Sequence, residues 1–312
     1  MTYLEERLAE RNVKVLKKEV INGAHAGRIY RINAIDKENQ NVNLVYKEVE
    51  TDRSNELDLY STSSNLIQQF NKVIAVWGSS PKAILMYDLN SPIKKGFELL
   101  SELDKKNLIE SILNRLAALH SLSNDKNSNG LPTHRITYEW HGWCIDQMNR
   151  LGAQHHWIQT DWIKIITNAY EQLDFKNFEP QCPQVITHGD PHLENIFLND
   201  GQIWLIDWEW AALSSPLRDI TIMCQDIYDT RLIQFVKESY QELLNNDNLN
   251  ISSQAYQRDF NYYYIDHTTM MLAWEIEKYF QDYTSEEKIK EIIEFKIGEI
   301  KRVTSEELEL LR

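Results

Sequence analysis

The stretch that decides the fold is His188-Gly189-Asp190-Pro191-His192-Leu193-Glu194-Asn195, followed after a short hairpin by Ile206-Asp207-Trp208-Glu209. It brings two carboxylates and one amide together, on Asp190, Asn195 and Asp207. Transfer of a γ-phosphoryl group needs a positioned hydroxyl, an acceptor for its proton, and Mg²⁺ held against the phosphate oxygens. One Asp can do the first two tasks, and an Asn and a second Asp supply the hard oxygen ligands that Mg²⁺ binds. The stretch therefore predicts a site suited to phosphoryl transfer.

The local sequence predicts how these groups are presented. Gln184–Thr187 is a short β-prone run that leads into the loop, and Ile196–Leu198 and Gln202–Ile206 are two more. Asn199-Asp200-Gly201 between the last two is a strong hairpin turn signal. Asp190 and Asn195 would lie on one loop and Asp207 at the end of the returning strand, so all three could converge on one metal–phosphate cluster.

The spacing D-x-x-x-x-N matches the catalytic loop of protein kinases, but two details differ. Gly189 stands between His188 and Asp190, and the second Asp lies in I-D-W-E instead of D-F-G. With these two departures, the segment resembles the aminoglycoside phosphotransferase and choline kinase branch of the kinase-like fold. The pattern of that branch is H-G-D-x-H-x-x-N, followed by a strand ending in I-D-[WF]-E. The resemblance implies Asp190 as the catalytic base and Asn195 and Asp207 as Mg²⁺ ligands. It also implies an α+β, two-lobed fold with a small β-rich N-terminal lobe.

The chain has the matching layout. Alternating runs such as Lys14–Ile21 and Val42–Val49 predict strands, and Val73–Trp77 and Ala83–Tyr87 predict a hairpin. Beyond Gly96 helical spacing prevails, with one helix through Leu99 to Leu119 and others at about 134–150, 157–173, 230–245, 254–282 and 285–302. We expect a nucleotide-binding lobe over residues 1–89 and a catalytic and substrate-binding lobe over residues 90–312.

The resemblance assigns further nucleotide-binding residues to the first lobe. Lys47, near the end of a strand, would contact the α- and β-phosphates and pair with a helix glutamate. Glu56 is the favoured partner because Glu-Leu-Asp-Leu-Tyr resembles the E-x-x-x-Y helix of the family. The nearby acids Glu50, Asp52 and Asp58 are rivals, since the start of the helix is uncertain.

Two further segments are assigned by their position alone. Gly23 and Gly27 lie between the first two strands, where a glycine-rich loop would cover the phosphates, although a plain hairpin turn is the alternative. Met86 and Asp88 lie where the family has a hinge whose backbone pairs with adenine.

Composition bounds the partners. The formal net charge of −14 disfavours nucleic acid or an anionic membrane as a partner and is compatible with a cationic acceptor or with an ordinary acidic surface. No run of 18 apolar residues and no signal-like N-terminus occurs, and the three cysteines lack a C-x-x-C pair. We therefore expect a cytoplasmic protein with reduced thiols, as a monomer or homodimer.

The second lobe is rich in aromatic residues, and their role is open. Such rings could bind an ammonium group by cation–π attraction, but core packing is the simpler interpretation. His120 and Asp219 are expected to pack and brace, and His188 and His192 to shape the loop through its backbone.

The sequence therefore favours an ATP- and Mg²⁺-dependent kinase acting on a hydroxyl of a small molecule, with GTP as an alternative donor. Aminoglycoside-like antibiotics, choline-like amino alcohols, thiamine and sugars are the candidate acceptors. The alternative is a non-catalytic kinase-like scaffold, which usually lacks one of Lys47, Asp190, Asn195 and Asp207, and all four are present. A protein kinase is disfavoured because no D-F-G or A-P-E segment occurs.

Overall fold

The computed structural model describes residues 3–21, 28–49, 55–62, 67–124, 131–246 and 251–310. The chain forms two compact units. The first contains Met1–Leu100, Asp125–Leu131 and His188–Ala211, and the second contains the remaining segments. The loop and hairpin that carry Asp190, Asn195 and Asp207 thus belong to the same unit as Lys47 and Glu56. The lobe boundary expected at residues 89 and 90 stays a prediction.

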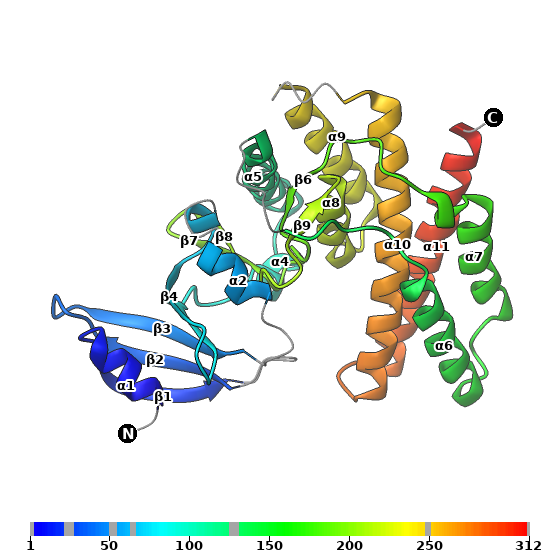
Figure 1. The fold of residues 1–312 in the computed structure, drawn as a ribbon. Coiled ribbons are helices and arrows are strands. Elements are labelled where there is room, and N and C mark those ends of the chain that lie inside the picture. The colour runs from blue at the N-terminus through cyan, green and yellow to red at the C-terminus, as the bar shows by residue number, and fades with distance from the viewer. Residues whose placement is uncertain are drawn as a thin grey trace. The chain divides into compact units, whose positions relative to one another are not determined.

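The first unit contains a five-stranded sheet in the order β1-β2-β3-β5-β4 (Figure 1). The strands are β1 (Lys14–Ile21), β2 (Ile29–Ile35), β3 (Asn41–Glu48), β4 (Val73–Trp77) and β5 (Ala83–Tyr87). Each neighbouring pair is antiparallel. β5 runs antiparallel to β3, so the end of β5 lies beside the first half of β3. There Asp88 N, directly after β5, donates to Asn43 O at 2.9 Å.

The two faces of this sheet differ in polarity, as strand alternation requires. One face buries Ile32, Leu44, Tyr46 and Leu85 against Leu4 and Leu8 of α1 (Tyr3–Glu10). Arg7 of α1 also donates to the Tyr46 hydroxyl at 2.6 Å. The opposite face, free of α1, carries Lys47.

Four further parts belong to the first unit. Helix α2 (Asn55–Thr62) follows β3, and the turn η1 (Gln68–Phe70) precedes β4. The hairpin β7 (Ile196–Asn199) and β8 (Gln202–Leu205) turns at Asp200 and Gly201, both of which have positive φ, as the turn signal predicts. Helix α4 (Lys94–Phe97) lies beside this hairpin, since Ile93 N donates to Ile196 O at 2.9 Å.

The second unit is helical around one small strand pair. Its long helices are α5 (Glu102–His120), α6 (Glu139–Gln154), α7 (Thr160–Gln172), α9 (Thr230–Asn246), α10 (Ser253–Phe280) and α11 (Glu286–Leu310). The shorter elements are η2 (Ser121–Asn124), η4 (Phe175–Asn177), β6 (Val185–Thr187), β9 (Ala212–Ser214), α8 (Leu217–Met223) and η5 (Cys224–Asp226). The pair β6–β9 is antiparallel, and β6 leads directly into the loop of Asp190.

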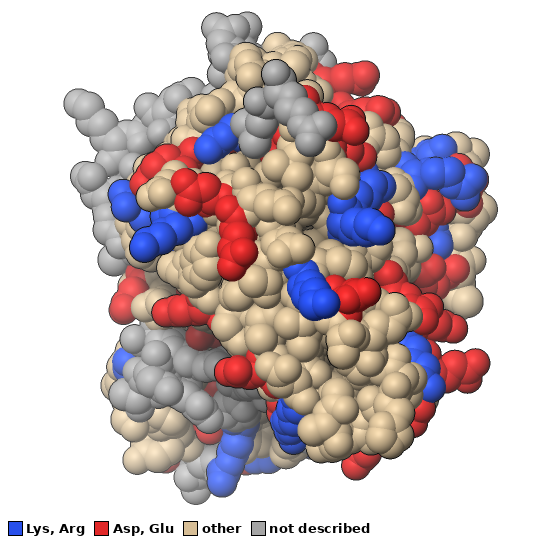
Figure 2. Space-filling model, turned by 90° about the vertical axis from the view of Figure 1, so that its right-hand side faces the viewer, with Lys and Arg blue, Asp and Glu red and all other residues tan. Residues whose placement is uncertain are grey.

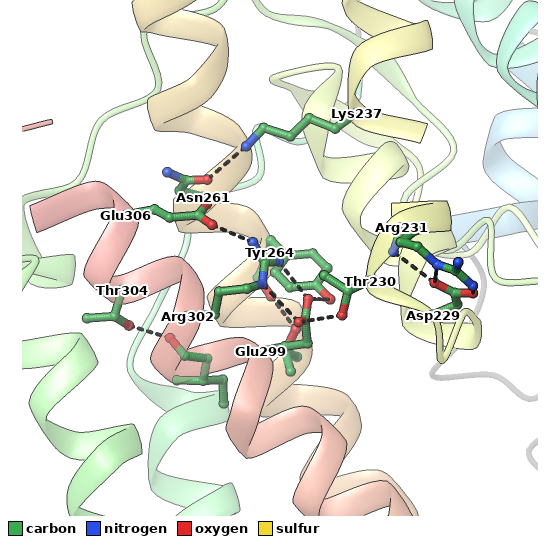
Figure 3. Close-up of polar contacts among 12 residues, drawn as sticks. Asp229, Thr230, Arg231, Lys237, Asn261, Tyr264, Glu299, Arg302, Thr304 and Glu306 are labelled. Carbon is green, nitrogen blue, oxygen red and sulfur yellow. Dashed lines mark hydrogen bonds and ion pairs between the residues drawn. The ribbon is translucent and has the colours of Figure 1, made fainter. Parts of the chain in front are cut away.

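A polar network centred on the buried Glu299 joins three of these helices (Figure 3). The Glu299 carboxylate of α11 accepts hydrogen bonds from Thr230 of α9 and Tyr264 of α10, both at 3.0 Å. Arg302 donates to both Glu299 oxygens, at 2.9 and 2.7 Å, and to Glu306 at 2.7 Å. Such a bidentate pair is among the stronger polar contacts in proteins.

Several expected element boundaries were wrong. The helix expected through Leu99 begins instead at Glu102, because the Ser101 hydroxyl caps it by accepting from Asp104 N, and Leu99 is exposed. The helix expected at residue 134 begins at Glu139, because the backbone of Pro132 and His134 bonds to Leu213 of β9. The last helix extends to Leu310, beyond the expected residue 302.

In the part of the chain that the structure describes, none of the helices combines the length and apolar character of a membrane span.

Candidate active site

The loop after β6 takes its shape from Gly189 and His188. Gly189 has a φ of 88°, a conformation that residues with a Cβ rarely adopt, which explains why glycine stands here. His188 is buried; its Nε2 lies 2.9 Å from Ile206 O, and its Nδ1 accepts from Asp190 N at 3.3 Å. The expectation that His188 shapes the loop through backbone bonds is confirmed, and His192 does the same by accepting from Glu194 N at 3.3 Å.

Asp190 and Asn195 lie against one another across this loop. The Asn195 amide nitrogen donates to Asp190 O at 2.9 Å and to Asp190 Oδ2 at 3.2 Å. His192 Nε2 lies 3.5 Å from the same carboxylate oxygen. The Asp190 side chain is part-exposed, so its carboxylate is held in place by neighbours and remains accessible to a ligand.

Lys47 lies between two carboxylates from distant parts of the chain. Its Nζ is 2.9 Å from Glu56 Oε2 on α2 and 3.0 Å from Asp207 Oδ1 after β8. The predicted lysine, its predicted glutamate partner and one predicted metal ligand are therefore in direct contact. In kinases, a strand lysine that contacts phosphates is paired with a helix glutamate in the same way.

Both carboxylate oxygens of Glu56 have hydrogen-bond partners. It is 1% exposed, and its other oxygen accepts from the Tyr60 hydroxyl and from Trp208 N, both at 3.3 Å. Its rival Asp58 on the same helix is exposed, and the rivals Glu50 and Asp52 lie outside the described residues. The structure thus pairs Lys47 with Glu56.

The electrostatics follow from these contacts. Burial by itself lowers the pKa of Lys47, but the carboxylates of Glu56 and Asp207 outweigh it and raise the pKa above its ordinary value. Burial also opposes ionisation of Asp207, yet the ammonium of Lys47 dominates and lowers the Asp207 pKa. Lys47 is therefore a cation and Asp207 an anion near neutral pH.

Asp207 has a φ of 64°, in the left-handed region that non-glycine residues seldom occupy. Aspartate tolerates this conformation better than most residues, and functional sites are where such backbone is found. The turn at Asp207 is fixed on both sides: Ile206 N donates to Asn195 O at 3.1 Å, and Trp208 N donates to Glu56.

The donor set suits Mg²⁺ better than a transition metal. Within the described ranges, no cluster of three or more His, Cys, Asp or Glu side chains stands at metal-binding positions. Mg²⁺ does not require one, because it commonly binds one or two protein oxygens and completes its shell with phosphates and water. Asp207, ionised and 40% exposed in its side chain, and the Asn195 amide provide such oxygens.

The remaining predicted nucleotide residues divide into two groups. Met86 lies on β5 directly opposite Val45 of β3, and Asp88 follows the end of β5. Both therefore flank the sheet face that carries Lys47. Gly23 and Gly27 lie outside the described residues.

Two features of the site escaped the sequence argument. Val45 and Ile29 are half-buried apolar side chains on the same face as Lys47, because Ile29 pairs with Lys47 and Val45 precedes it by two residues. The period of two, counted back from Lys47, would have found Val45. Trp208 is fully buried, and the centroids of its ring and of the His188 ring are 4.5 Å apart. Because its backbone N also donates to Glu56, Trp208 connects the loop to this glutamate.

In the second unit, the packing interpretation is confirmed for His120, for Asp219 and for some of the aromatic residues. His120 is buried and hydrogen-bonded to Tyr240 and, at 3.0 Å, to Asp219. Tyr262 and Tyr170 are buried and stack on Phe178 and Phe175, each with ring centroids 4.3 Å apart. The role of four half-buried rings stays open: Trp140, Trp143, Trp157 and Trp274.

The chain belongs to the phosphotransferase enzyme family, whose family model matches residues 83–248. A search of the curated proteins finds no match.

Solved structures share the fold at low sequence identity. The spectinomycin phosphotransferase APH(9)-Ia, in complex with ADP and spectinomycin, is 16% identical with a TM-score of 0.64, covering 97% of both chains. The choline kinase LicA from Streptococcus pneumoniae is 12% identical with a TM-score of 0.57, covering 95% of this chain and 97% of its own. A choline kinase from Cryptosporidium parvum is 12% identical with a TM-score of 0.60, covering 97% and 91%. The expected kinase-like fold, with an antiparallel β-rich N-terminal part and a helical C-terminal part, is confirmed.

Proposed function

We propose that this phosphotransferase is a small-molecule kinase that moves the γ-phosphoryl group of ATP, or of GTP, to a hydroxyl group with the help of Mg²⁺. Asp190 orients the hydroxyl and accepts its proton. Lys47, held by Glu56, binds the phosphates, and Asn195 and Asp207 hold Mg²⁺, which neutralises the charge that develops on the phosphate oxygens.

The observation that carries the proposal is the contact of Lys47 with both Glu56 and Asp207. A part-buried lysine paired with two acids is not explained by stability alone, because buried ion pairs seldom stabilise a fold more than apolar residues of similar size. The arrangement suits a nucleotide with Mg²⁺: Lys47 would donate to a phosphate, and the Asp207 carboxylate would bind the metal. The ADP, GDP and AMP in solved structures of this fold support nucleotide use.

For the acceptor we propose a hydroxylated amine that carries positive charge. Structures of similar fold act on or bind spectinomycin, kanamycin and choline, and a further one is an ethanolamine kinase. The formal charge of −14 favours a cation over an anion. On the face in Figure 2, acidic and basic side chains are interspersed over the described residues, which suits a small ligand better than a polyanion.

The decisive experiment replaces Asp190 with Asn and measures turnover with Mg²⁺, ATP or GTP, and a panel of amino sugars and amino alcohols. We expect turnover to fall about 10²- to 10⁴-fold while nucleotide affinity stays near that of the wild type, because general-base contributions are of this size. Glu194→Gln is the matched control, since it removes an exposed carboxylate from the same loop.

Near-normal turnover in Asp190→Asn would remove Asp190 from the centre of the mechanism. A wild-type protein that binds Mg²⁺–nucleotide but phosphorylates none of the panel would contradict the cationic acceptor. A protein that binds no nucleotide at all would favour the scaffold alternative.

A further inference from the structure

Arg31 of β2 reaches across the sheet to the segment that follows β5. Its Nε lies 2.7 Å from Asp88 Oδ2, and one of its terminal nitrogens donates to Asn90 O at 3.4 Å. The Asp88 side chain is only 8% exposed, whereas that of Arg31 is 40% exposed. Arg31 therefore holds a side chain and a backbone carbonyl of the same short segment.

The segment Asp88–Asn90 is fixed from the inside as well. The other oxygen of Asp88 accepts from Asn90 N at 2.9 Å, and Asp88 N donates to Asn43 O at 2.9 Å. Asn90 has a φ of 71°, a conformation that needs support from its surroundings in a non-glycine residue. The Asp88 carboxylate thus joins Arg31 to the turn at Asn90.

These contacts lie on the sheet face that carries Lys47. Arg31 is opposite Val45 in the β2–β3 register, and Val45 is opposite Met86 in the β3–β5 register. A cavity of about 350 Å³ lies beside this segment; its lining includes Arg31, Asn43, Asp88 and Asn90 but neither Val45 nor Lys47, so it adjoins the place of a base over Val45 without containing it. Its lining is polar, which suits a group that forms hydrogen bonds.

A nucleotide whose phosphates lie at Lys47 can place its ribose and base along β3, on the face of Val45 and Asn43. Asn43 lies four residues before Lys47 on β3, about 13 Å along an extended strand. The Asp88 backbone lies beside Asn43, two residues before Val45, so the edge of a base laid over Val45 can reach it. Hydrogen bonds to a base edge depend on donors and acceptors held in fixed positions, so the conformation of this segment matters.

We propose that the Arg31–Asp88 ion pair is a positioning element for the nucleotide base: it fixes the backbone of Asp88–Asn90 and so sets base affinity and base selectivity. The proposal rests on the proposed function, since it requires a nucleotide at Lys47. Arg31 itself is a positioning residue, and its effect passes through Asp88 and Asn90.

The test measures binding of the Mg²⁺ complexes of the β,γ-imido analogues of ATP and GTP by calorimetry. In Arg31→Ala we expect about 5- to 10-fold weaker binding of the preferred nucleotide and a smaller loss for the other, because misaligned base hydrogen bonds each contribute a few-fold. Tm should change by no more than about 3 °C, since a part-exposed ion pair contributes little to stability. Arg11→Ala is the matched control: it removes a guanidinium contact to Ile74 O, at 3.3 Å, on the α1 side of the sheet.

Asp88→Ala and the double variant Arg31→Ala/Asp88→Ala complete a cycle. If Arg31 and Asp88 act as a unit, the nucleotide affinity of the double variant should equal that of the single variant with the lower affinity. Unchanged affinities in Arg31→Ala, an equal loss for both nucleotides, or additive losses in the double variant would overturn the positioning role. A wild-type protein that binds neither analogue would overturn the kinase proposal instead.

Discussion

At the scale of single residues, the site depends on charges that are close together before any ligand binds. Lys47 contacts two acids, and the strained backbone of Asp207 aims one of them at the lysine. Such strain persists only where neighbours fix it, and here Glu56 bonds to Trp208 N and Asn195 bonds to Ile206 N. The geometry is therefore preorganised by contacts on both sides of Asp207.

This preorganisation leads to a prediction about Asp207 and Asn195, the two proposed metal ligands. Asp207→Ala should weaken Mg²⁺-dependent nucleotide binding by at least about 10-fold, and more than Asn195→Ala does. The reason is that a carboxylate contributes charge as well as an oxygen, whereas an amide contributes a neutral oxygen. Calorimetry with and without Mg²⁺ measures the difference.

Asp200→Asn, in the hairpin turn of the same unit, is the control because it removes an exposed carboxylate and keeps a residue type that tolerates positive φ. Equal Mg²⁺–nucleotide affinity in the wild type and in Asp207→Ala would show that the metal binds elsewhere.

At the scale of elements, the helical unit depends on buried polar groups as well as on apolar packing. Glu299 joins α9, α10 and α11 through the bonds drawn in Figure 3. Burial alone raises the pKa of Glu299, but hydrogen bonds from Arg302 and attraction to its charge overcome this and lower it. Glu299 is therefore ionised in the folded protein, and its partners depend on its charge.

Glu299→Gln should lower the free energy of unfolding by about 2 kcal/mol, because Arg302 loses its bidentate carboxylate partner but keeps its bond to Glu306. The contribution of Glu299 is fully present above the ordinary glutamate pKa of about 4.3 and is lost as the pH falls below it, because the folded pKa is the lower one. Urea unfolding at pH 7 and at pH 3.5 measures both effects.

Glu306→Gln serves as the comparison, since Glu306 binds the same Arg302 from a more exposed position. It should cost less than about 1 kcal/mol. Equal losses for both variants would mean that burial of Glu299 adds nothing to the pair.

Asp266 of α10 shows the opposite behaviour. It is completely buried, and burial raises its pKa to about 7, although a hydrogen bond from the Tyr170 hydroxyl at 2.7 Å favours ionisation. Its second oxygen has no hydrogen-bond partner among the described residues. The folded protein therefore keeps the Asp266 proton over a pH range in which the unfolded chain has released it.

Between about pH 4 and pH 7, Asp266 should make the folded state less stable as the pH rises, because the unfolded chain binds fewer protons there. Asp266→Asn removes this effect. Its stability relative to the wild type should increase by up to about 1.4 kcal/mol per pH unit between pH 5 and 7, and then level off. Thermal unfolding from pH 5 to 8 measures this, with Asp282→Asn, an exposed site just after α10, as the control. A difference that does not change with pH would show that Asp266 ionises normally inside the fold.

At the scale of the whole molecule, the net charge of −14 acts at long range on any charged ligand. If the acceptor is a hydroxylated amine, its affinity should weaken as salt is raised, because exposed charges are screened over about 8–10 Å near physiological ionic strength. Nucleotide affinity, which we propose depends on Mg²⁺ and short contacts, should change less. A panel in which only neutral sugars are phosphorylated, with affinity independent of salt, would contradict the cationic acceptor and leave the kinase proposal intact.

The sequence by itself determined what depends on short stretches of chain. The bounds of β1, β4 and β5 were predicted to the residue, because alternation and turn residues are local signals. The hairpin at Asp200 and Gly201 follows from a local turn signal in the same way. Helix α1 and strand β9 were not predicted, because eight and three residues give too little periodicity without the surface on which they pack.

Only the tertiary structure decided which distant groups meet. The resemblance favoured Glu56 over Asp58, and the structure decides it, because the helical turn directs Glu56 toward Lys47 and leaves Asp58 exposed. Asp207, 160 residues from Lys47, completes the cluster. Arg31 finds Asp88 only because β3 and β5 are neighbours in the sheet, so that the end of β5 lies within reach of β2. Local sequence specifies backbone conformation, whereas such pairings depend on strand order and packing, to which residues throughout the unit contribute.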